Sequence, residues 1–326
     1  MVTPDASIRV MKLLFLGPPE VLGRIRSKLP GWEVCLTNEP EDVDALLSDA
    51  NAVLDAYMRV EFSRERLEVA GRLSVFVTAT TGFDHIDADF LKERSVPLLT
   101  LRDQQAFLKY ITPAAEHSWL LLMACARRLR GATEHVLDGQ WDRNQFPGVF
   151  LRGKTLGIIG CGRIGGWMAH YAEAFGMQRI GYDPFVEEWP SNIERSELDP
   201  LLTQADFLSV HVPLVDGTRC LLGPDEFARI KPGCVFVNTS RGEIIDEPSL
   251  LAALEEGRIL AAGLDVVTGE PDVSDHALVE YALKHDNLLI TPHIGGYSPD
   301  ALSVVLDFCC RRIIDHFDGE YARTTD

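Results

Sequence analysis

Residues 154–183 read KTLGIIGCGRIGGWMAHYAEAFGMQRIGYD, and this stretch decides the fold. Lys154 to Ile159 form a short apolar and β-branched run, which is typical of a buried parallel strand. A glycine-rich turn follows, then an apolar stretch at helical spacing to about Phe175, and then a second strand over 178–182 that ends at Asp183. Strand, glycines, helix, strand and acid in this order predict a βαβ unit that binds a dinucleotide.

The six residues from Gly160 to Gly165 (GCGRIG) explain why a dinucleotide would bind at this turn. Gly160 allows the tight turn, Gly162 lets the backbone approach a pyrophosphate, and Gly165 lets helix and strand pack closely. The helix N-terminus adds free N–H groups and a partial positive charge for the phosphates. A glycine triplet alone also occurs in ordinary tight turns. Here, however, Asp183 lies 18 residues beyond Gly165, where a carboxylate accepts hydrogen bonds from a ribose diol, so we predict that the chain binds NAD.

Composition limits the classes of partner. The chain has 326 residues, of which 46% are hydrophobic and 25% charged, and this length suits two domains with sizeable cores. The formal net charge of −18 argues against a nucleic acid or an anionic membrane as partner. It also means that an anionic substrate would have to be held by a few local cations and backbone N–H groups.

Cysteine usage and the N-terminal residues predict a cytoplasmic protein. The seven cysteines include no C-x-x-C pair, which favours reduced thiols over a disulfide framework. The start of the chain lacks the cationic-then-apolar pattern of a signal peptide. No apolar run approaches the ~20 residues that a transmembrane helix needs.

The first hundred residues alternate between predicted strands and helices. Strands are expected at 10–16, 33–36, 52–54, 73–79 and 96–101. Five strands alternating with helices predict an open, mostly parallel sheet. The first turn has no glycine triplet, so the dinucleotide is not expected here. Thr81 and Gly82 follow the fourth strand at its carboxyl end, where open α/β sheets bind ligands.

The alternation resumes after the βαβ unit and completes a second doubly wound domain. Further strands are expected at 206–212, 234–238, 260–267 and 288–291, and a final amphipathic helix at 298–317. That helix is expected to pack back on the first domain. We therefore predict an α/β fold in which a Rossmann NAD-binding domain (112–296) is inserted into a flavodoxin-like substrate domain (1–111 and 297–326), with a cleft between the two.

Two segments favour a homodimer. A helix expected over 113–129 is apolar nearly all round, so it has to be covered on more than one side. The loop 139–150 that follows carries Trp141, Phe146 and Phe150 between glycines and prolines. These aromatic residues suit packing on a second copy of the chain; the alternative is that they cap a local core.

Three polar residues follow predicted strands of the second domain, on the edge that also carries the glycine loop. Arg241 follows CVFVNTS, Glu270 follows GLDVVTG and His293 follows LLITP. A reductase of 2-keto acids needs a guanidinium for the carboxylate and carbonyl oxygen and a group that donates a proton. A carboxylate beside the imidazole would favour its charged form and orient it. Taken singly, the three residues could instead be a surface ion-pair partner, a turn residue before Pro271 and a strand-end cap.

The motifs around these residues closely resemble those of the D-isomer-specific 2-hydroxyacid dehydrogenases. They read NTSRGEIIDE, GLDVVTGEP and TPHIGG, with TLGIIGCGRIG upstream. The resemblance covers nearly the whole chain and is densest from Ala114 to Gly296. It implies an enzyme that interconverts a 2-keto acid and a D-2-hydroxy acid with NAD.

The resemblance also implies a role for each site residue. Arg241 would bind substrate, His293 would be the acid–base group and Glu270 its partner. The backbone of Thr81 and Gly82 would bind the substrate carboxylate. Asp265 would contact the nicotinamide carboxamide, and no metal is implied. The other residues placed at the cofactor, besides the glycines and Asp183, are Arg163, Ile164, Pro213, Thr218 and Thr239.

Other functions remain open within this resemblance. Formate dehydrogenases of the same fold have a glutamine where this chain has Glu270, and phosphite dehydrogenases use a lysine in the loop that here reads Ala79-Thr80-Thr81-Gly82. Both are therefore less favoured. A co-repressor-like protein that senses NAD(H) keeps the same three polar residues, so the motifs do not exclude it. The acidic chain without long tails disfavours that alternative.

The segment after the fifth strand sets the expected substrate class. Many glyoxylate and hydroxypyruvate reductases have an Asn-Thr-Pro-like turn there, whereas residues 101–112 read LRDQQAFLKYIT. In this segment the chain resembles phosphoglycerate-dehydrogenase-like members with an altered substrate pocket. Arg102 and Lys109 are cations in an acidic chain. We predict that at least one of them binds a second anionic group on the substrate, although Arg and Lys in loops are more often solvated.

Overall fold

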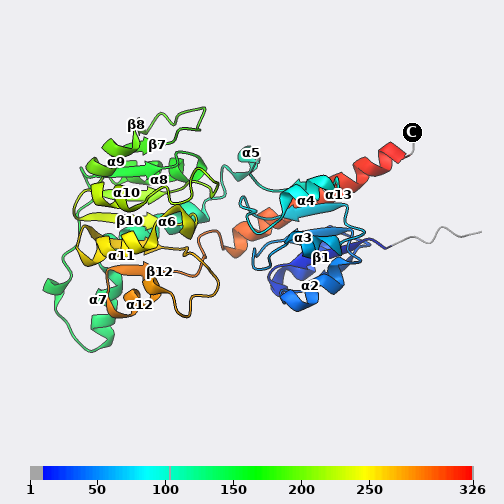
Figure 1. Ribbon diagram of the computed structural model, residues 1–326, viewed down its shortest axis with the longest axis horizontal. Coiled ribbons are helices and arrows are strands. Elements are labelled where there is room, and N and C mark those ends of the chain that lie inside the picture. The colour runs from blue at the N-terminus through cyan, green and yellow to red at the C-terminus, as the bar shows by residue number, and fades with distance from the viewer. Residues whose placement is uncertain (1–9, 103, 325–326) are drawn as a thin grey trace, which may run out of the picture. The chain divides into compact units, whose positions relative to one another are not determined.

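The computed structural model describes residues 10–102 and 104–324, and the chain divides into two compact units (Figure 1). Unit 1 comprises Met1–Leu108 and Ser298–Asp326, and unit 2 comprises Lys109–Tyr297. The sequence-based boundaries lie after residues 111 and 296. Each unit is built on its own parallel β-sheet.

Unit 1 has the flavodoxin-like arrangement. Its five strands lie in the order β2-β1-β3-β4-β5 and pair in parallel, an order that places the chain reversal beside β1. Every residue of β3 and β4 is buried, as expected for central parallel strands covered on both faces. The strands are β1 (Lys12–Leu16), β2 (Glu33–Leu36), β3 (Ala52–Asp55), β4 (Val75–Thr78) and β5 (Leu98–Leu99). The helices between them are α1 (Leu22–Lys28), α2 (Pro40–Leu47), α3 (Arg64–Glu68) and α4 (Ala88–Glu93), and α5 (Gln105–Leu108) follows β5.

The long C-terminal helix α13 (Pro299–Thr324) completes unit 1. It packs against α1 and β4. Asp307 of α13 binds the Arg24 guanidinium through both carboxylate oxygens, at 2.7 and 2.8 Å. The ring of Phe308 stacks on Phe107 of α5 at 4.0 Å between centroids. These contacts join the two ends of the chain in one unit.

Unit 2 has the arrangement of dinucleotide-binding domains. Its seven strands lie in the order β12-β11-β10-β9-β6-β7-β8, all in parallel, so counting from β6 the order is 3-2-1-4-5-6 with one added strand. The order of strands along the sheet reverses at β6, whose neighbours are β7 and β9. The strands are β6 (Thr155–Ile159), β7 (Gln178–Tyr182), β8 (Glu194–Arg195), β9 (Phe207–Val210), β10 (Cys234–Asn238), β11 (Ile259–Leu264) and β12 (Leu288–Ile290).

Helices cover both faces of this sheet. The helices α6 (Pro113–Ala126) and α8 (Arg163–Ala174) pack on one face, while α9 (Leu198–Gln204), α10 (Pro224–Arg229), α11 (Glu247–Glu255) and α12 (Ala277–Lys284) pack on the other. Side chains along β10 alternate between the two cores: Val235 and Val237 face α6 and α8, and Phe236 faces the opposite set. The two-domain α/β fold predicted from the sequence is confirmed.

The helix expected over 113–129 is shorter in the structure. It ends at Ala126, and Arg128 has a φ of 48°, after which α7 (Leu129–Leu137) begins. The Arg128 guanidinium donates to both oxygens of Asp286 at 3.0 Å. This ion pair joins residues far apart in the sequence, so local periodicity does not reveal the break.

Candidate active site

In the glycine loop between β6 and α8, Gly160 and Gly165 leave no room for a side chain, whereas the space beside Gly162 is empty. Gly160 has a φ of 93°, and a Cβ there would lie 2.7 Å from the backbone of His211. A Cβ on Gly165 would collide with the carbonyl oxygen of Gly160. Gly162, the N-cap of α8, would meet nothing within 4 Å. The surface at Gly162 is therefore open to a ligand, and the helix N-terminus beside it favours an anion.

Asp183 lies directly after β7 and next to this loop. Its Oδ2 accepts the N–H of Cys161 at 2.9 Å, and its Oδ1 accepts the N–H groups of Phe185 and Val186 at 2.9 and 3.1 Å. A carboxylate has about four acceptor positions. The acid is thus fixed against the glycine loop and retains an acceptor position for a ribose hydroxyl.

Other residues expected at the cofactor lie in the loop after β9 and in the first turn of α8. Thr218 is buried, and its hydroxyl donates to the carbonyl oxygen of Pro213 at 2.6 Å, which closes the loop after β9. The Arg163 guanidinium donates to the carbonyl oxygen of Ile111, and burial lowers its pKa. Ile164 follows in the first turn of α8.

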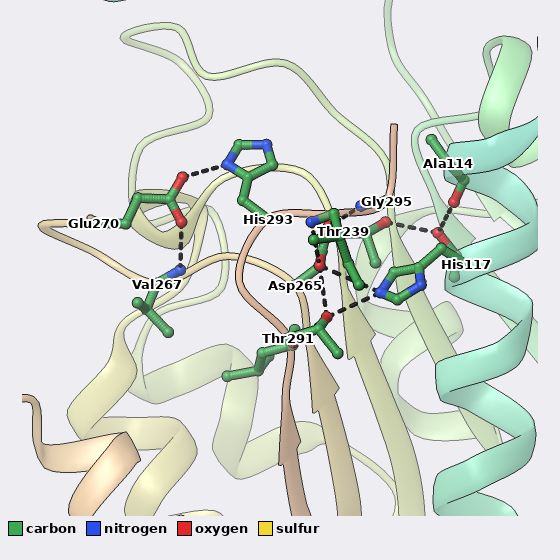
Figure 2. A network of polar contacts seen from close by, with 12 residues as sticks. Ala114, His117, Thr239, Asp265, Val267, Glu270, Thr291, His293 and Gly295 are labelled. Atoms are coloured by element: carbon green, nitrogen blue, oxygen red, sulfur yellow. Dashed lines mark hydrogen bonds and ion pairs between the residues drawn. The ribbon is translucent and has the colours of Figure 1, made fainter. Parts of the chain in front are cut away.

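His293 and Glu270 are in contact at the carboxyl edge of the sheet (Figure 2). His293 follows β12 and Glu270 follows β11. The ring Nδ1 of His293 hydrogen-bonds the Glu270 carboxylate, whose other oxygen accepts the N–H of Val267 at 3.4 Å. An ionised carboxylate only accepts, so Nδ1 carries the hydrogen and Nε2 remains for a substrate. The side chains are 37% and 31% exposed, so a small molecule can reach them.

Arg241 follows β10, the strand next to β11. Its guanidinium donates to the carbonyl oxygen of Ser240 at 2.7 Å. The turn is shaped by Asn238, which is fully buried: its amide donates to the carbonyl oxygen of Arg241 at 2.8 Å, and its Oδ1 accepts the N–H of Ser240 at 3.0 Å. Arg241, Glu270 and His293 thus lie on one edge of the sheet, and Glu270 and His293 are in contact.

Asp265, expected at the nicotinamide, is enclosed by protein donors. Only 1% of the residue is exposed. Its Oδ2 accepts the N–H of Gly295 at 2.7 Å, and its Oδ1 accepts the N–H of Ile294 at 2.9 Å. His117 and Thr291 also donate to Oδ1, at 3.2 and 2.5 Å. Burial alone would raise the pKa of Asp265, but the hydrogen bonds of His117 and Thr291 and of the two backbone groups outweigh it and lower that pKa.

Three residues of this edge escaped the sequence analysis: Asn238, Thr291 and His117. A signal for His117 was present, because it stands with Ser118 in a helix that is otherwise largely apolar. The Ser118 hydroxyl donates to the carbonyl oxygen of Ala114 at 2.7 Å, so the Thr239 hydroxyl must donate to Ser118, also at 2.7 Å. Thr239, expected at the cofactor, is thus held by α6.

Of the other candidate substrate residues, Thr81, Gly82 and Arg102 belong to unit 1. Thr81 and Gly82 follow β4 in a loop where the Thr80 hydroxyl donates to the carbonyl oxygen of Gly82 at 2.7 Å. The Arg102 guanidinium lies over the ring of Phe83 in the same loop, 4.7 Å from its centroid. Lys109 belongs to unit 2, with its ammonium 5.5 Å from the ring centroid of Tyr110. Only Arg102 is therefore beside the Thr81–Gly82 loop within one unit.

Family models match both halves of the chain. Residues 119–295 match the NAD binding domain of the D-isomer specific 2-hydroxyacid dehydrogenases, and residues 13–106 match the catalytic domain of the same family. The chain belongs to this family. The resemblance seen in the sequence is confirmed, as is NAD as the cofactor of this 2-hydroxyacid dehydrogenase family member.

Relatives with assigned names include several dehydrogenases. A D-3-phosphoglycerate dehydrogenase of Methanocaldococcus jannaschii is 35% identical over 297 residues, 89% of this chain and 54% of the relative. A hydroxypyruvate reductase of Thermotoga maritima is 37% identical over 235 residues, 72% of this chain and 74% of the relative. This 2-hydroxyacid dehydrogenase family member thus spans about half the length of the phosphoglycerate dehydrogenases that it matches.

A solved structure has the same fold as this family member. The D-lactate dehydrogenase of Aquifex aeolicus, complexed with NAD and lactic acid, superposes with a TM-score of 0.84 at 26% identity, over 95% of this chain and 96% of that chain. None of the helices within residues 10–102 and 104–324 combines the length and apolarity of a membrane span. Among the side chains described there, no three from His, Cys, Asp and Glu are grouped to hold a metal ion.

Proposed function

We propose that the protein is an NAD-dependent dehydrogenase that interconverts a 2-keto acid and a D-2-hydroxy acid. One observation carries this proposal: the Glu270–His293 pair lies at the sheet edge that also holds the open Gly162 turn. The family relatives named as dehydrogenases and reductases support it.

The residues divide the chemistry between them. The cofactor, held at the Gly162 turn and Asp183, would supply a hydride to C2 of the keto acid as NADH or accept one from C2 of the hydroxy acid as NAD⁺. In reduction, His293 donates the proton on Nε2 to the carbonyl oxygen, while Glu270 fixes the orientation of the ring through its contact with Nδ1. Arg241 presents a planar fork of donors to the substrate carboxylate and to the oxygen that gains charge. We further propose that the backbone N–H groups of Thr81 and Gly82 bind the substrate carboxylate.

A substrate panel tests this function. Oxidation of NADH is followed with pyruvate, hydroxypyruvate and 2-keto acids that carry a second anionic group, and reduction of NAD with formate and with phosphite. Turnover of at least one 2-keto acid is expected. Turnover of formate or phosphite alone would favour the alternative dehydrogenases. Tight NADH binding without any turnover would favour an NAD(H)-sensing protein.

Asp183 is expected to select NAD over NADP. Its carboxylate would lie against the 2′-phosphate of NADP, and residues 184–188 (PFVEE) supply no cation. Because like charges in contact cost several kcal/mol, kcat/KM should be roughly 100-fold higher with NADH than with NADPH. Asp183→Ser should narrow this ratio. Comparable kcat/KM values for the two cofactors in the unmodified protein would contradict the assignment.

Arg102, rather than Lys109, is expected to recognise a second anionic group on the substrate. The guanidinium lies beside the loop that carries Thr81 and Gly82. Arg102→Ala should raise KM roughly 10-fold for a phosphorylated 2-keto acid, the value of one hydrogen bond to a charged group, and leave KM for pyruvate unchanged. Lys109→Ala is the matched control. Equal KM changes for both substrates, or none, would show that Arg102 has no such role.

We propose that two copies of the chain pair through α6, α7 and the loop that follows. Leu120, Leu137, Trp141 and Phe150 are 56%, 80%, 89% and 73% exposed, an unusual density of large apolar side chains. Phe146 instead packs on His135 at 5.2 Å between centroids. Sedimentation equilibrium should give twice the chain mass of 36.2 kDa, and Trp141→Glu should shift the protein toward the monomer. A monomer in the unmodified protein at micromolar concentration would contradict the pairing.

The thiols support our proposal of a cytoplasmic location. All seven cysteines are free. Burial raises the pKa of Cys125 and Cys309 to about 12, which keeps these thiols protonated and unreactive. Fractionation of cells that express the full-length protein would test the location.

A further inference from the structure

His117 connects helix α6 to the ends of two strands in unit 2 (Figure 2). Its side chain is 12% exposed and points at the carboxyl edge of the sheet. The ring Nε2 lies 2.9 Å from the Thr291 hydroxyl after β12 and 3.2 Å from the Asp265 carboxylate after β11. A largely buried histidine on an apolar helix is thus bonded to Asp265, the residue that holds the turn at His293.

The hydrogen bonds determine which ring nitrogen of His117 carries a hydrogen. The Thr291 hydroxyl donates to the Asp265 carboxylate at 2.5 Å, so its oxygen is left as an acceptor. An ionised carboxylate also only accepts. Both partners of Nε2 are therefore acceptors, and Nε2 of His117 is the donor to both.

Asp265 in turn holds the turn that carries His293. Its two carboxylate oxygens accept the N–H groups of Ile294 and Gly295, and its backbone carbonyl accepts the N–H of His293 at 2.9 Å. His293 has a φ of 53°, in the left-handed region that residues other than glycine rarely adopt. Such a conformation persists only where the surrounding contacts enforce it. Asp265 supplies three of those contacts.

We propose that His117 is a positioning residue for the acid–base pair: its Nε2–H fixes the Asp265 carboxylate, which fixes residues 293–295 and hence the imidazole of His293. The proposal rests on the proposed function, in which His293 transfers the proton. His117 does not have to touch the substrate, because it acts through Asp265. The same Nε2–H also donates to the Thr291 hydroxyl and so holds that side chain in place.

Because Asp265 is buried, its carboxylate depends on each protein donor that bonds to it. The carboxylate is nearly without solvent contact, so the donors around it replace water. Without His117, the carboxylate loses one of the hydrogen bonds that hold it in place and lower the pKa of Asp265. A carboxylate that is held less firmly fixes the Ile294 and Gly295 N–H groups less firmly, and the turn loosens.

Three variants separate positioning from general stability. His117→Leu keeps an apolar side chain and removes the donor, and His117→Gln restores a donor through its amide nitrogen. Leu122→Ala is the control, because Leu122 is a fully buried residue of the same helix whose loss removes packing only. For each variant, kcat and KM for a 2-keto acid and the NADH affinity by fluorescence titration are measured.

His117→Leu should lower kcat roughly 10- to 100-fold, as for the loss of a hydrogen bond to a charged group. NADH affinity should change much less than kcat, because the glycine loop and Asp183 also hold the cofactor. His117→Gln should recover most of kcat, and Leu122→Ala should retain it. Equal losses in the Leu and Gln variants, or the same loss in Leu122→Ala, would overturn the proposal. So would unchanged kcat in His117→Leu.

Hydrogen–deuterium exchange of residues 293–296 gives a readout that needs no turnover. Their amides should exchange faster in His117→Leu than in the unmodified protein and His117→Gln. Failure of the unmodified protein to reduce any 2-keto acid would refute the proposed function, while this exchange would still test the positioning. Unchanged exchange in His117→Leu would overturn the positioning even if the enzyme is active.

Discussion

His293→Ala is expected to reduce kcat for 2-keto acid reduction by roughly 100- to 10 000-fold, the range contributed by general acid–base catalysis. The reason is that Nε2 of His293 is the atom left to donate the proton once Nδ1 is bound by Glu270. NADH affinity should change little, because the glycine loop and Asp183 hold the cofactor independently. Steady-state kinetics and fluorescence titration measure the two quantities.

A second histidine–glutamate pair in unit 2 provides the control. Nε2 of His276 lies 3.1 Å from Glu247, and both side chains are largely buried. His276→Ala removes a comparable histidine–carboxylate contact and the N-cap of α12, so it reports the cost of such a loss at a residue that is not proposed to contact the substrate. Near wild-type turnover in His293→Ala, or an equal loss in His276→Ala, would remove His293 from the mechanism.

Arg241→Gln is expected to lower kcat/KM for the 2-keto acid by roughly 100- to 1000-fold, the cost of removing one donor from a developing oxyanion. The loss arises because Arg241 supplies the fixed charge for the carboxylate and the carbonyl oxygen. Arg241→Lys should recover only part of it, since an ammonium lacks the planar fork of donors.

Arg229→Gln is the matched control for Arg241. Arg229 ends α10 on the surface and pairs with Asp199 at 2.8 Å. An exposed pair of this kind contributes about 0–1 kcal/mol, so the variant should keep kcat/KM. If Arg241→Gln behaved like Arg229→Gln, the substrate would have to be held by other groups.

The sequence predicted the fold where local pattern and tertiary structure agree. The strands β7 and β10 have the predicted bounds. The strand β10 is a short apolar run that ends in a polar turn, and β7 is ended by Asp183. The break after α6 was missed, since the left-handed Arg128 is stabilised by Asp286 from a distant loop. The strand β8 has two residues, too few for any period to appear.

The site was predicted only in part, because some of its contacts depend on how distant elements pack. Arg241, Glu270 and His293 could be placed on one edge, because the carboxyl ends of parallel strands lie together. The sequence also predicted that Glu270 is the partner of His293, a contact now present in the structure. The link from His117 to Asp265 could not be predicted, because it depends on how α6 packs against β11.

The central claim is tested most directly by following the hydride. A 2-keto acid that the enzyme reduces is incubated with NADH carrying two deuterium atoms at C4 of the nicotinamide, and the product is analysed by mass spectrometry and chiral chromatography. The account predicts a D-2-hydroxy acid with one deuterium at C2. A product without deuterium at C2, or one of L configuration, would contradict it.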